Sequence, residues 1–159
     1  MRNLSETYES TPGCVAQART QLADFAAQLG ATPRQIEAVR LAASEAMTNA
    51  VRHAYRGGSG LIYVNAAVAC GELWILISDD GCGLRPRADR PGLGLGLGLG
   101  LMSQVSDDFG IVSRATGGTE VRLRFNLVPA EAGAGALGGS EHTGNGIGRA
   151  GLTQSMSVA

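Results

Sequence analysis

The chain contains 159 residues, 44% of them hydrophobic and 17% charged, with a formal net charge of −1 at pH 7. This length predicts one domain with a sizeable core, and the near-zero charge gives no electrostatic case for binding nucleic acid or an anionic membrane. We expect no signal peptide and no membrane span, because no apolar stretch approaches the roughly 20 residues that cross a bilayer. Cys14, Cys70 and Cys82 are odd in number, far apart and without C-x-x-C spacing, so we expect neither a disulfide framework nor a zinc site, which favours the reducing cytoplasm.

Two helices are predicted in the first third of the chain. Thr11 as the N-cap and Gly30 as the stop delimit the first helix. Thr32 and Gln35 have the spacing of a capping box and open the second helix, which we expect to run to about Tyr55. The apolar face of the first helix comprises Val15, Leu22, Phe25 and Leu29, and that of the second comprises Ile36, Val39, Ala43, Met47, Ala50 and Ala54.

A change in hydrophobic period predicts strands in the second half of the domain. Short apolar runs at 61–69 and 73–78 are joined by a tight turn. A short helix is expected at 101–110, followed by a hairpin of 111–115 with 119–128, where apolar and polar residues alternate. Hairpin strands with helices elsewhere in the chain predict an α+β fold in which helices cover one face of a single sheet.

The composition changes near Pro129. Residues 130–159 contain no aromatic side chain, no hydrophobic period and many glycines, so they cannot bury enough apolar area to offset the entropy cost of ordering. We therefore expect residues 1–129 to form the domain and residues 130–159 to be a disordered Gly/Ala-rich tail.

The second predicted helix carries polar residues in an otherwise apolar segment, SEAMTNAVRHAY. Glu45 and Asn49 are four residues apart and therefore lie one above the other on one helix face, with His53 one turn further on. Such a row is either an exposed polar stripe or part of a binding site. The Ala, Val and Met residues around it favour a site.

A second motif, ISDDGCGL, follows a strongly apolar strand. Asp79 closes that strand, and Gly81 and Gly83 let the backbone turn sharply and come close to a flat ligand. The Asp79 carboxylate can then accept a hydrogen bond from an amino group of that ligand. An ordinary strand-ending turn is the alternative, since Asp and Gly are common in turns.

Gly and Leu alternate from Gly92 to Leu101, directly before the predicted helix. Permissive backbone ahead of a helix N-terminus leaves amide groups free to bind phosphate oxygens. Replication slippage is the alternative explanation for the length of the repeat, and it does not exclude a functional end. A P-loop is excluded because no Gly-Lys-Ser/Thr follows. A fourth segment, TGGTEV, is typical of a hairpin turn.

In order and spacing these motifs resemble the nucleotide-binding boxes of the GHKL, or Bergerat-fold, ATPases. LAASEAMTNAVRHAY is similar to the N box, DDGCG to the first glycine box, GLGLGLM to the second and GGTEV to the last. The likeness is greatest to bacterial anti-sigma-factor serine kinases and covers roughly Thr11 to Leu127. It implies a two-layer α/β sandwich of the histidine kinase-like ATPase type, with a mixed, mainly antiparallel sheet that bears helices on one face.

The resemblance implies that the N box and the second glycine box bind Mg²⁺ and the phosphates of ATP. Asn49 would ligate Mg²⁺, Glu45 would act as general base, and His53 would contact a phosphate. Backbone donors to the phosphates would come from Gly96, Gly98 and Gly100, with Leu101 and Met102 fixing the register. The repeat leaves that register open by one Gly-Leu unit in either direction, so that Gly94 can take the place of Gly96.

The other two boxes are implied to bind the base. Asp79 would accept from the adenine amino group, Gly81 and Gly83 would make room for the purine, and Thr119 would lie near the adenine, through a water molecule. The segment between the glycine boxes would be the ATP lid, and we expect its arginines to be solvated, namely Arg85, Arg87 and Arg90.

These roles imply a cytoplasmic, Mg²⁺- and ATP-dependent serine kinase that acts as an anti-sigma factor. It would phosphorylate an anti-anti-sigma protein, release it, and capture a sigma factor, working as a homodimer with no nucleic acid or membrane partner. Two alternatives stay open. One is a nucleotide-gated binding module that sequesters a partner without phosphoryl transfer, and the other is a degenerate relative that no longer binds nucleotide.

Overall fold

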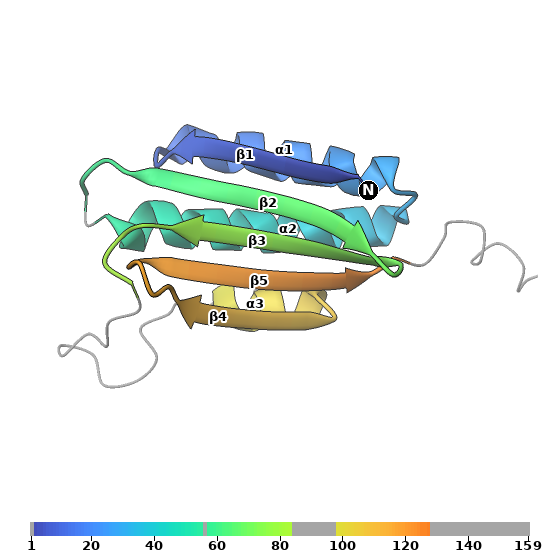
Figure 1. The fold of residues 1–159 in the computed structure, drawn as a ribbon. Coiled ribbons are helices and arrows are strands. Elements are labelled where there is room, and N and C mark those ends of the chain that lie inside the picture. The colour runs from blue at the N-terminus through green and yellow to red at the C-terminus, as the bar shows by residue number, and fades with distance from the viewer. Residues whose placement is uncertain (1, 56, 84–97, 128–159) are drawn as a thin grey trace, which may run out of the picture.

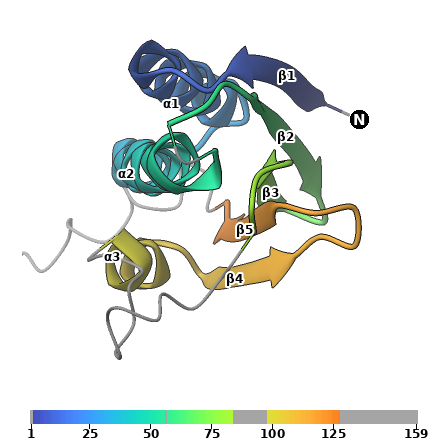
Figure 2. The ribbon, with the colours of Figure 1, turned by 90° about the vertical axis from the view of Figure 1, so that its left-hand side faces the viewer.

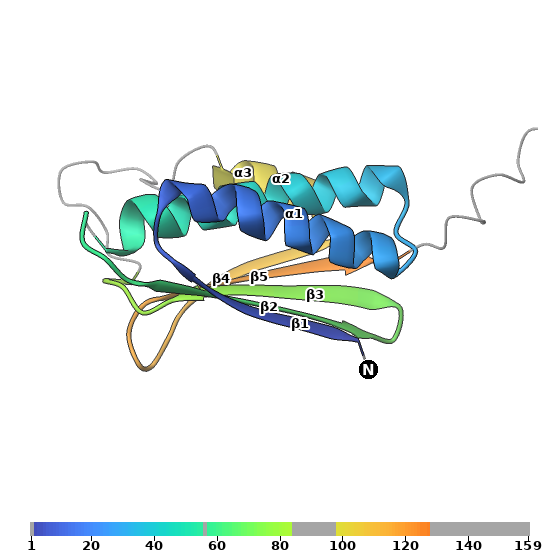
Figure 3. The same cartoon turned by 90° about the horizontal axis from the view of Figure 1, so that it is seen from above.

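The computed structural model of the chain describes residues 2–55, 57–83 and 98–127. The elements follow in chain order as β1 (Asn3–Glu9), α1 (Pro12–Gln28), α2 (Pro33–Asn49), a π-helical turn η1 (Ala50–Ala54), β2 (Leu61–Ala69), β3 (Glu72–Asp79), α3 (Gly98–Val105), β4 (Asp108–Ser113) and β5 (Thr119–Asn126). Figure 1 shows the sheet in front of the helices, and the turned views of Figure 2 and Figure 3 show all three α-helices on the same face. The predicted α+β layer architecture is confirmed.

The five strands are ordered β1-β2-β3-β5-β4. All four pairings between the described strands are antiparallel, so the expectation of a mixed sheet is wrong for this part of the chain. β1 pairs with β2 at one edge of the sheet and was not predicted from the sequence. Its sequence, NLSETYE, buries only Tyr8 and half-buries Leu4, too weak an alternation to reveal a strand.

The core lies between the sheet and the helices. Alternate residues of the central strands point toward the helices and are buried: Ile62, Val64 and Ala66 from β2, Leu73, Ile75 and Ile77 from β3, and Val121, Leu123 and Phe125 from β5. Leu22 of α1 and Met47 of α2 are fully buried against this face. Each such side chain contributes about 1.5–3 kcal/mol to folding, which fixes the helices over the sheet.

The start of α2 follows the predicted capping box. The Gln35 amide donates to Thr32 Oγ1 at 3.3 Å, and the Gln35 side chain accepts from the Thr32 amide at 2.9 Å. The end of this helix differs from expectation, because α2 stops at Asn49 and continues as the π-helical turn η1. A π turn inserts extra backbone, so residues after Asn49 are rotated out of the preceding row.

The region after the Gly/Leu repeat also departs from the prediction. The helix α3 starts within the repeat at Gly98 and ends at Val105, whereas a helix was predicted over 101–110. Residues 108–110, predicted as the end of that helix, instead open the edge strand β4 (Asp108–Ser113), and the predicted pairing of residues 111–113 with β5 is confirmed. Phe109 and Ile111 of β4 pack against the core. Within the described ranges, none of the helices has the length and apolarity needed to cross a membrane.

Candidate functional site

Asp79 is a buried carboxylate at the end of β3, with 5% of its surface exposed. It pairs with Ile62 in the sheet register, and both residues belong to the helix-covered face. Its Oδ1 atom accepts from two backbone amides, those of Gly81 at 2.9 Å and Thr119 at 3.3 Å. Burial raises the pKa of Asp79, and the two amides together with the nearby Arg114 charge oppose that rise.

The first predicted glycine box packs on the end of the N-box segment. A Cβ atom on Gly81 would lie 2.2 Å from the Ala54 carbonyl oxygen, so only glycine fits this contact. The next amide, that of Cys82, donates to the same carbonyl at 2.8 Å. The turn after Asp79 is therefore attached directly to η1, the continuation of α2.

The β4–β5 hairpin approaches Asp79 from the other side. Gly118 has φ of +83°, and a Cβ atom there would lie 1.9 Å from the Asp79 carbonyl oxygen. Gly83 has φ of +70° and faces the Gly118 carbonyl oxygen, which would lie 3.3 Å from an added Cβ. The first and the last predicted boxes thus meet backbone to backbone around Asp79.

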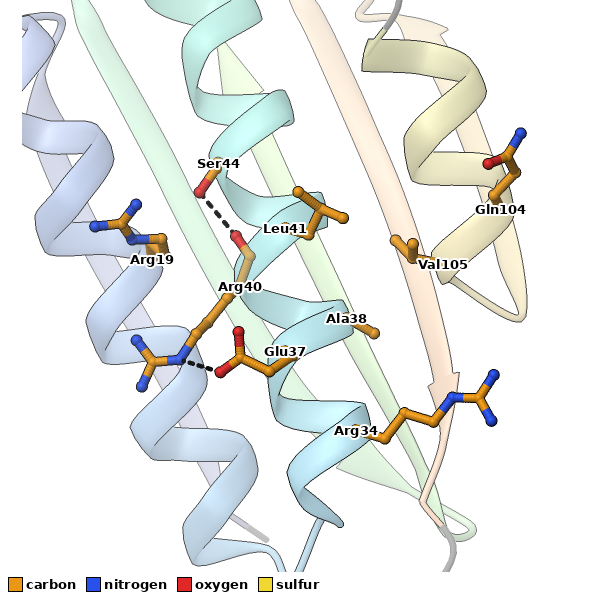
Figure 4. Close-up of a pocket in the computed structure, with 9 residues that line it drawn as sticks. All are labelled: Arg19, Arg34, Glu37, Ala38, Arg40, Leu41, Ser44, Gln104 and Val105. Carbon is orange, nitrogen blue, oxygen red and sulfur yellow. Dashed lines mark hydrogen bonds and ion pairs between the residues drawn. The ribbon is translucent and has the colours of Figure 1, made fainter.

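Glu45 and Asn49 are both half-buried on α2. Ala38 and Leu41, earlier on the same helix, line a shallow groove of about 690 Å³ together with Val105 of α3. Figure 4 shows Leu41 and Val105 pointing toward each other across this groove. Positions 38, 41, 45 and 49 follow helical spacing, so Glu45 and Asn49 continue the row that faces α3.

The N-terminus of α3 lies at the same end of the molecule as the C-terminal part of α2, because the two helices run in opposite directions (Figure 3, Figure 4). Gly98 and Gly100 belong to the first turn of α3, with Leu101 directly after them. The prediction that these glycines precede the helix is therefore wrong, because they form its start. The first amides of a helix have no intrahelical partner and suit anions.

His53 lies in η1 and is exposed. The π turn begins after Asn49, so His53 does not simply extend the row of Glu45 and Asn49 by one α-helical turn. Its side chain stays a candidate contact at the end of the site. Gly94, Gly96, the three lid arginines and the predicted tail at 130–159 lie outside the described residues.

The groove in Figure 4 is separate from this cluster. It is lined by Arg19, Arg34, Glu37, Ala38, Arg40, Leu41, Ser44, Gln104 and Val105. None of these residues was predicted to contact a nucleotide. Asp79 and the two glycine turns lie at the other end of α2, so the groove is not the candidate nucleotide site.

The chain also matches a family of known proteins. Residues 8–125 match the family described as the histidine kinase-like ATPase domain. The chain belongs to this family. The match covers nearly all of the residues that the structure describes, so the predicted resemblance and fold are confirmed.

The curated relatives of this histidine kinase-like ATPase domain include anti-sigma factors. An anti-sigma F factor of Clostridium acetobutylicum is 30% identical over 126 residues, which cover 70% of this chain and 85% of the relative. An anti-sigma F factor of Clostridium botulinum is 34% identical over 129 residues, covering 71% of this chain and 87% of the relative.

Solved structures give the same fold. The crystal structure of the RsbU and RsbW domains of Rv1364c from Mycobacterium tuberculosis has a TM-score of 0.63 at 28% identity. The match covers 80% of this chain but 33% of that one, so the present chain spans about a third of it. The histidine kinase domain of a blue-light-activated kinase from Erythrobacter litoralis matches in fold, with a TM-score of 0.52 at 22% identity, over 71% of this chain and 61% of that one.

Three residues around Asp79 in this ATPase domain were not singled out from the sequence. Arg114 donates to the Asp79 carbonyl oxygen at 2.9 Å, and Tyr55 accepts from the Asp80 amide at 3.0 Å through its hydroxyl. Gly118 makes the close approach to Asp79 described above. Gly118 and Tyr55 stood inside quoted motifs without a role, whereas no sequence signal marked Arg114.

Proposed function

We propose that this chain is an anti-sigma factor that binds Mg·ATP at the Asp79 cluster and phosphorylates a serine of an anti-anti-sigma protein. The observation that carries the proposal is the state of the Asp79 carboxylate. It is buried, and Oδ1 takes both backbone amides, which among the described residues leaves Oδ2 to accept from the amino group of a purine. A buried acceptor of this kind discriminates strongly for a ligand that donates to it.

The relatives support the regulatory part of the proposal. Proteins named anti-sigma F factor match at 30% and 34% identity and are covered over most of their length. The RsbW domain of the solved mycobacterial protein supports the same assignment. A cytoplasmic location and a homodimer stay predictions, and sedimentation of the purified chain at several concentrations tests the second.

The donor set fits Mg²⁺ bound together with a nucleotide. Magnesium usually keeps several waters and takes one or two protein oxygens with substrate phosphates, and a half-buried amide oxygen from Asn49 meets that need. Bound Mg²⁺ would neutralise charge on the phosphates during transfer.

The chain's own residues would then position the reacting groups. Glu45, one helical turn before Asn49, would accept the proton of the attacking serine hydroxyl as its oxygen bonds to the γ-phosphorus and the bond to the β-phosphate oxygen breaks. The first amides of α3 would hold phosphate oxygens, and Asp79 would fix the base. Phosphorylation adds negative charge to the antagonist surface, which would favour its release and let the sigma factor bind.

The test separates binding from transfer. Purified chain is titrated calorimetrically with Mg·ATP, and transfer from labelled ATP is followed on candidate anti-anti-sigma proteins. Glu45→Ala should abolish transfer and keep most ATP binding, whereas the control Glu37→Ala, on the exposed side of the same helix and paired with Arg40 at 3.3 Å, should leave both intact.

Three other outcomes would count against the kinase. ATP binding without transfer to any candidate would favour the nucleotide-gated binding module. Absence of ATP binding in the unaltered protein would favour the degenerate relative. Equal transfer by Glu45→Ala and the unaltered protein would remove Glu45 from the mechanism.

A further inference from the structure

The peptide group that follows Asp79 is held at both of its polar atoms by side chains from distant parts of the chain. Its carbonyl oxygen, on Asp79, accepts from Arg114 Nη1 at 2.9 Å. Its amide, on Asp80, donates to the Tyr55 hydroxyl at 3.0 Å. A strand end normally leaves such groups to water, so this double attachment fixes the plane of one peptide and with it the direction of the Asp79 side chain.

Asp80 links these attachments on the face of the sheet that the helices leave uncovered. Its carboxylate forms an ion pair with Arg114 and accepts from the Tyr63 hydroxyl at 2.8 Å. The Arg114 guanidinium also lies 6.0 Å from the centre of the Tyr63 ring. Tyr63 alternates with the buried Ile62 and Val64 and therefore points away from the core.

Tyr55 connects the same peptide to the helix layer. Its hydroxyl donates to the Leu61 carbonyl oxygen at the start of β2 while it accepts from Asp80. A Cβ on Gly60 would lie 2.1 Å from the Tyr55 ring, so the glycine is needed for the ring to reach this position. Tyr55 directly follows η1, and it thus ties the end of α2 to the turn after Asp79.

We propose that Tyr55, Tyr63, Asp80 and Arg114 form a clamp that positions the Asp79 carboxylate and so sets the preference for a purine with a 6-amino group. This inference rests on the proposed function. The four are positioning residues, since they lie on the peptide or on the far face of the sheet and act on the ligand through Asp79. A buried acceptor loses most of its selectivity when its direction is no longer fixed, because a hydrogen bond weakens steeply with misalignment.

The readout is the ratio of dissociation constants for ITP and ATP, which differ at position 6, where ITP has a carbonyl oxygen and ATP an amino group. The unaltered protein should prefer ATP. Arg114→Ala and Asp80→Asn should weaken ATP binding about tenfold and change ITP binding less than about twofold, so that the preference collapses. A general loss of stability would lower both affinities together and leave the ratio unchanged.

Arg124→Ala is a matched control. Arg124 lies 5.7 Å from the Trp74 ring centre and pairs with Glu72 at 2.6 Å, the same chemistry as Arg114 at a distant place on the same face. This variant should keep the preference of the unaltered protein. Tyr55→Phe, which keeps the ring and removes one hydroxyl, serves as the mild second variant and should also reduce the preference.

The outcomes separate this inference from the proposed function. If the unaltered protein does not bind ATP, the proposed function fails and the clamp fails with it. If it binds ATP and ITP equally, the role of Asp79 in base recognition fails, and the clamp fails with it. If the unaltered protein prefers ATP and the Arg114, Asp80 and Tyr55 variants keep that preference, the clamp alone is overturned. An equal loss of preference in Arg124→Ala would overturn it as well.

Discussion

Gly117 and Gly118 offer a controlled test of how the β4–β5 hairpin shapes the site. Both have positive φ, +97° and +83°, so an alanine at either position adopts a strained left-handed backbone. They differ in their surroundings. An added Cβ on Gly117 meets nothing within 4 Å, whereas one on Gly118 would lie 1.9 Å from the Asp79 carbonyl oxygen and 2.8 Å from the Asp80 Cα.

The magnitudes follow from that difference. Gly117→Ala should lower the free energy of unfolding by about 1–2 kcal/mol through backbone strain alone. Gly118→Ala carries the same strain and a further cost of about 1–3 kcal/mol, because backbone must move to relieve the collision. That movement displaces the Asp79 peptide from Arg114, so ATP affinity should fall at least about tenfold, or about 1.4 kcal/mol.

Denaturant unfolding measures the first quantity, and calorimetric titration with Mg·ATP at a temperature where both variants are folded measures the second. Gly117→Ala should bind ATP within about twofold of the unaltered protein, since a twofold change is well below 1 kcal/mol. Equal ATP affinities of the two variants, whether both weakened or both unchanged, would refute the reasoning that the hairpin acts through Asp79.

Four further predictions concern single side chains. Asp79→Asn keeps an Oδ1 acceptor for both backbone amides and removes a buried charge, so it should match or exceed the unaltered protein in thermal stability at pH 7. Burial raises the pKa of Asp79, so between the ordinary carboxyl pKa and the raised one the folded protein holds a proton that the unfolded chain has lost. The free energy of unfolding should therefore fall as pH rises through that window. An unfolding series against pH should show this fall in the unaltered protein and not in Asp79→Asn. Asp79→Asn should weaken ATP binding more than Glu45→Ala, and equal losses by calorimetry would contradict the assigned base-binding and catalytic roles. Thr32→Ala removes a side-chain cap bonded at 3.3 Å and should cost about 1 kcal/mol in denaturant unfolding; Thr11→Ala, at an N-cap without a side-chain hydrogen bond, should cost clearly less.

Local patterns predicted the parts of the fold that depend on neighbouring residues. The capping box at Thr32 placed the start of α2, and the alternation of Val121, Leu123 and Phe125 identified the buried face of β5. The edge strands β1 and β4 were harder to predict from the sequence, because an edge strand needs few inward-facing apolar residues. Asp108 opens β4 within a polar segment that looked helical, and its strand identity comes from pairing with Arg124 on β5.

The residues of the candidate site also differ in whether a local sequence pattern marks them. Asp79 and Gly81 were found because their types and spacing have a meaning within a few residues of chain. Arg114 was not, because its contact with Asp79 joins residues 35 apart and depends on the β3–β5 register. The π turn after Asn49 was also missed, since helical periodicity contains no signal for an inserted residue.

The start of α3 inside the Gly/Leu repeat has a consequence for how this chain can vary. Each Gly-Leu unit is identical to the next, so losing or gaining one would still leave Gly, Leu, Gly and Leu at the residues that open the helix. The change in length would fall wholly on the connection between β3 and α3. Replication slippage at this repeat would therefore lengthen or shorten the connection in steps of two residues. The residue types on either side of the connection would stay the same.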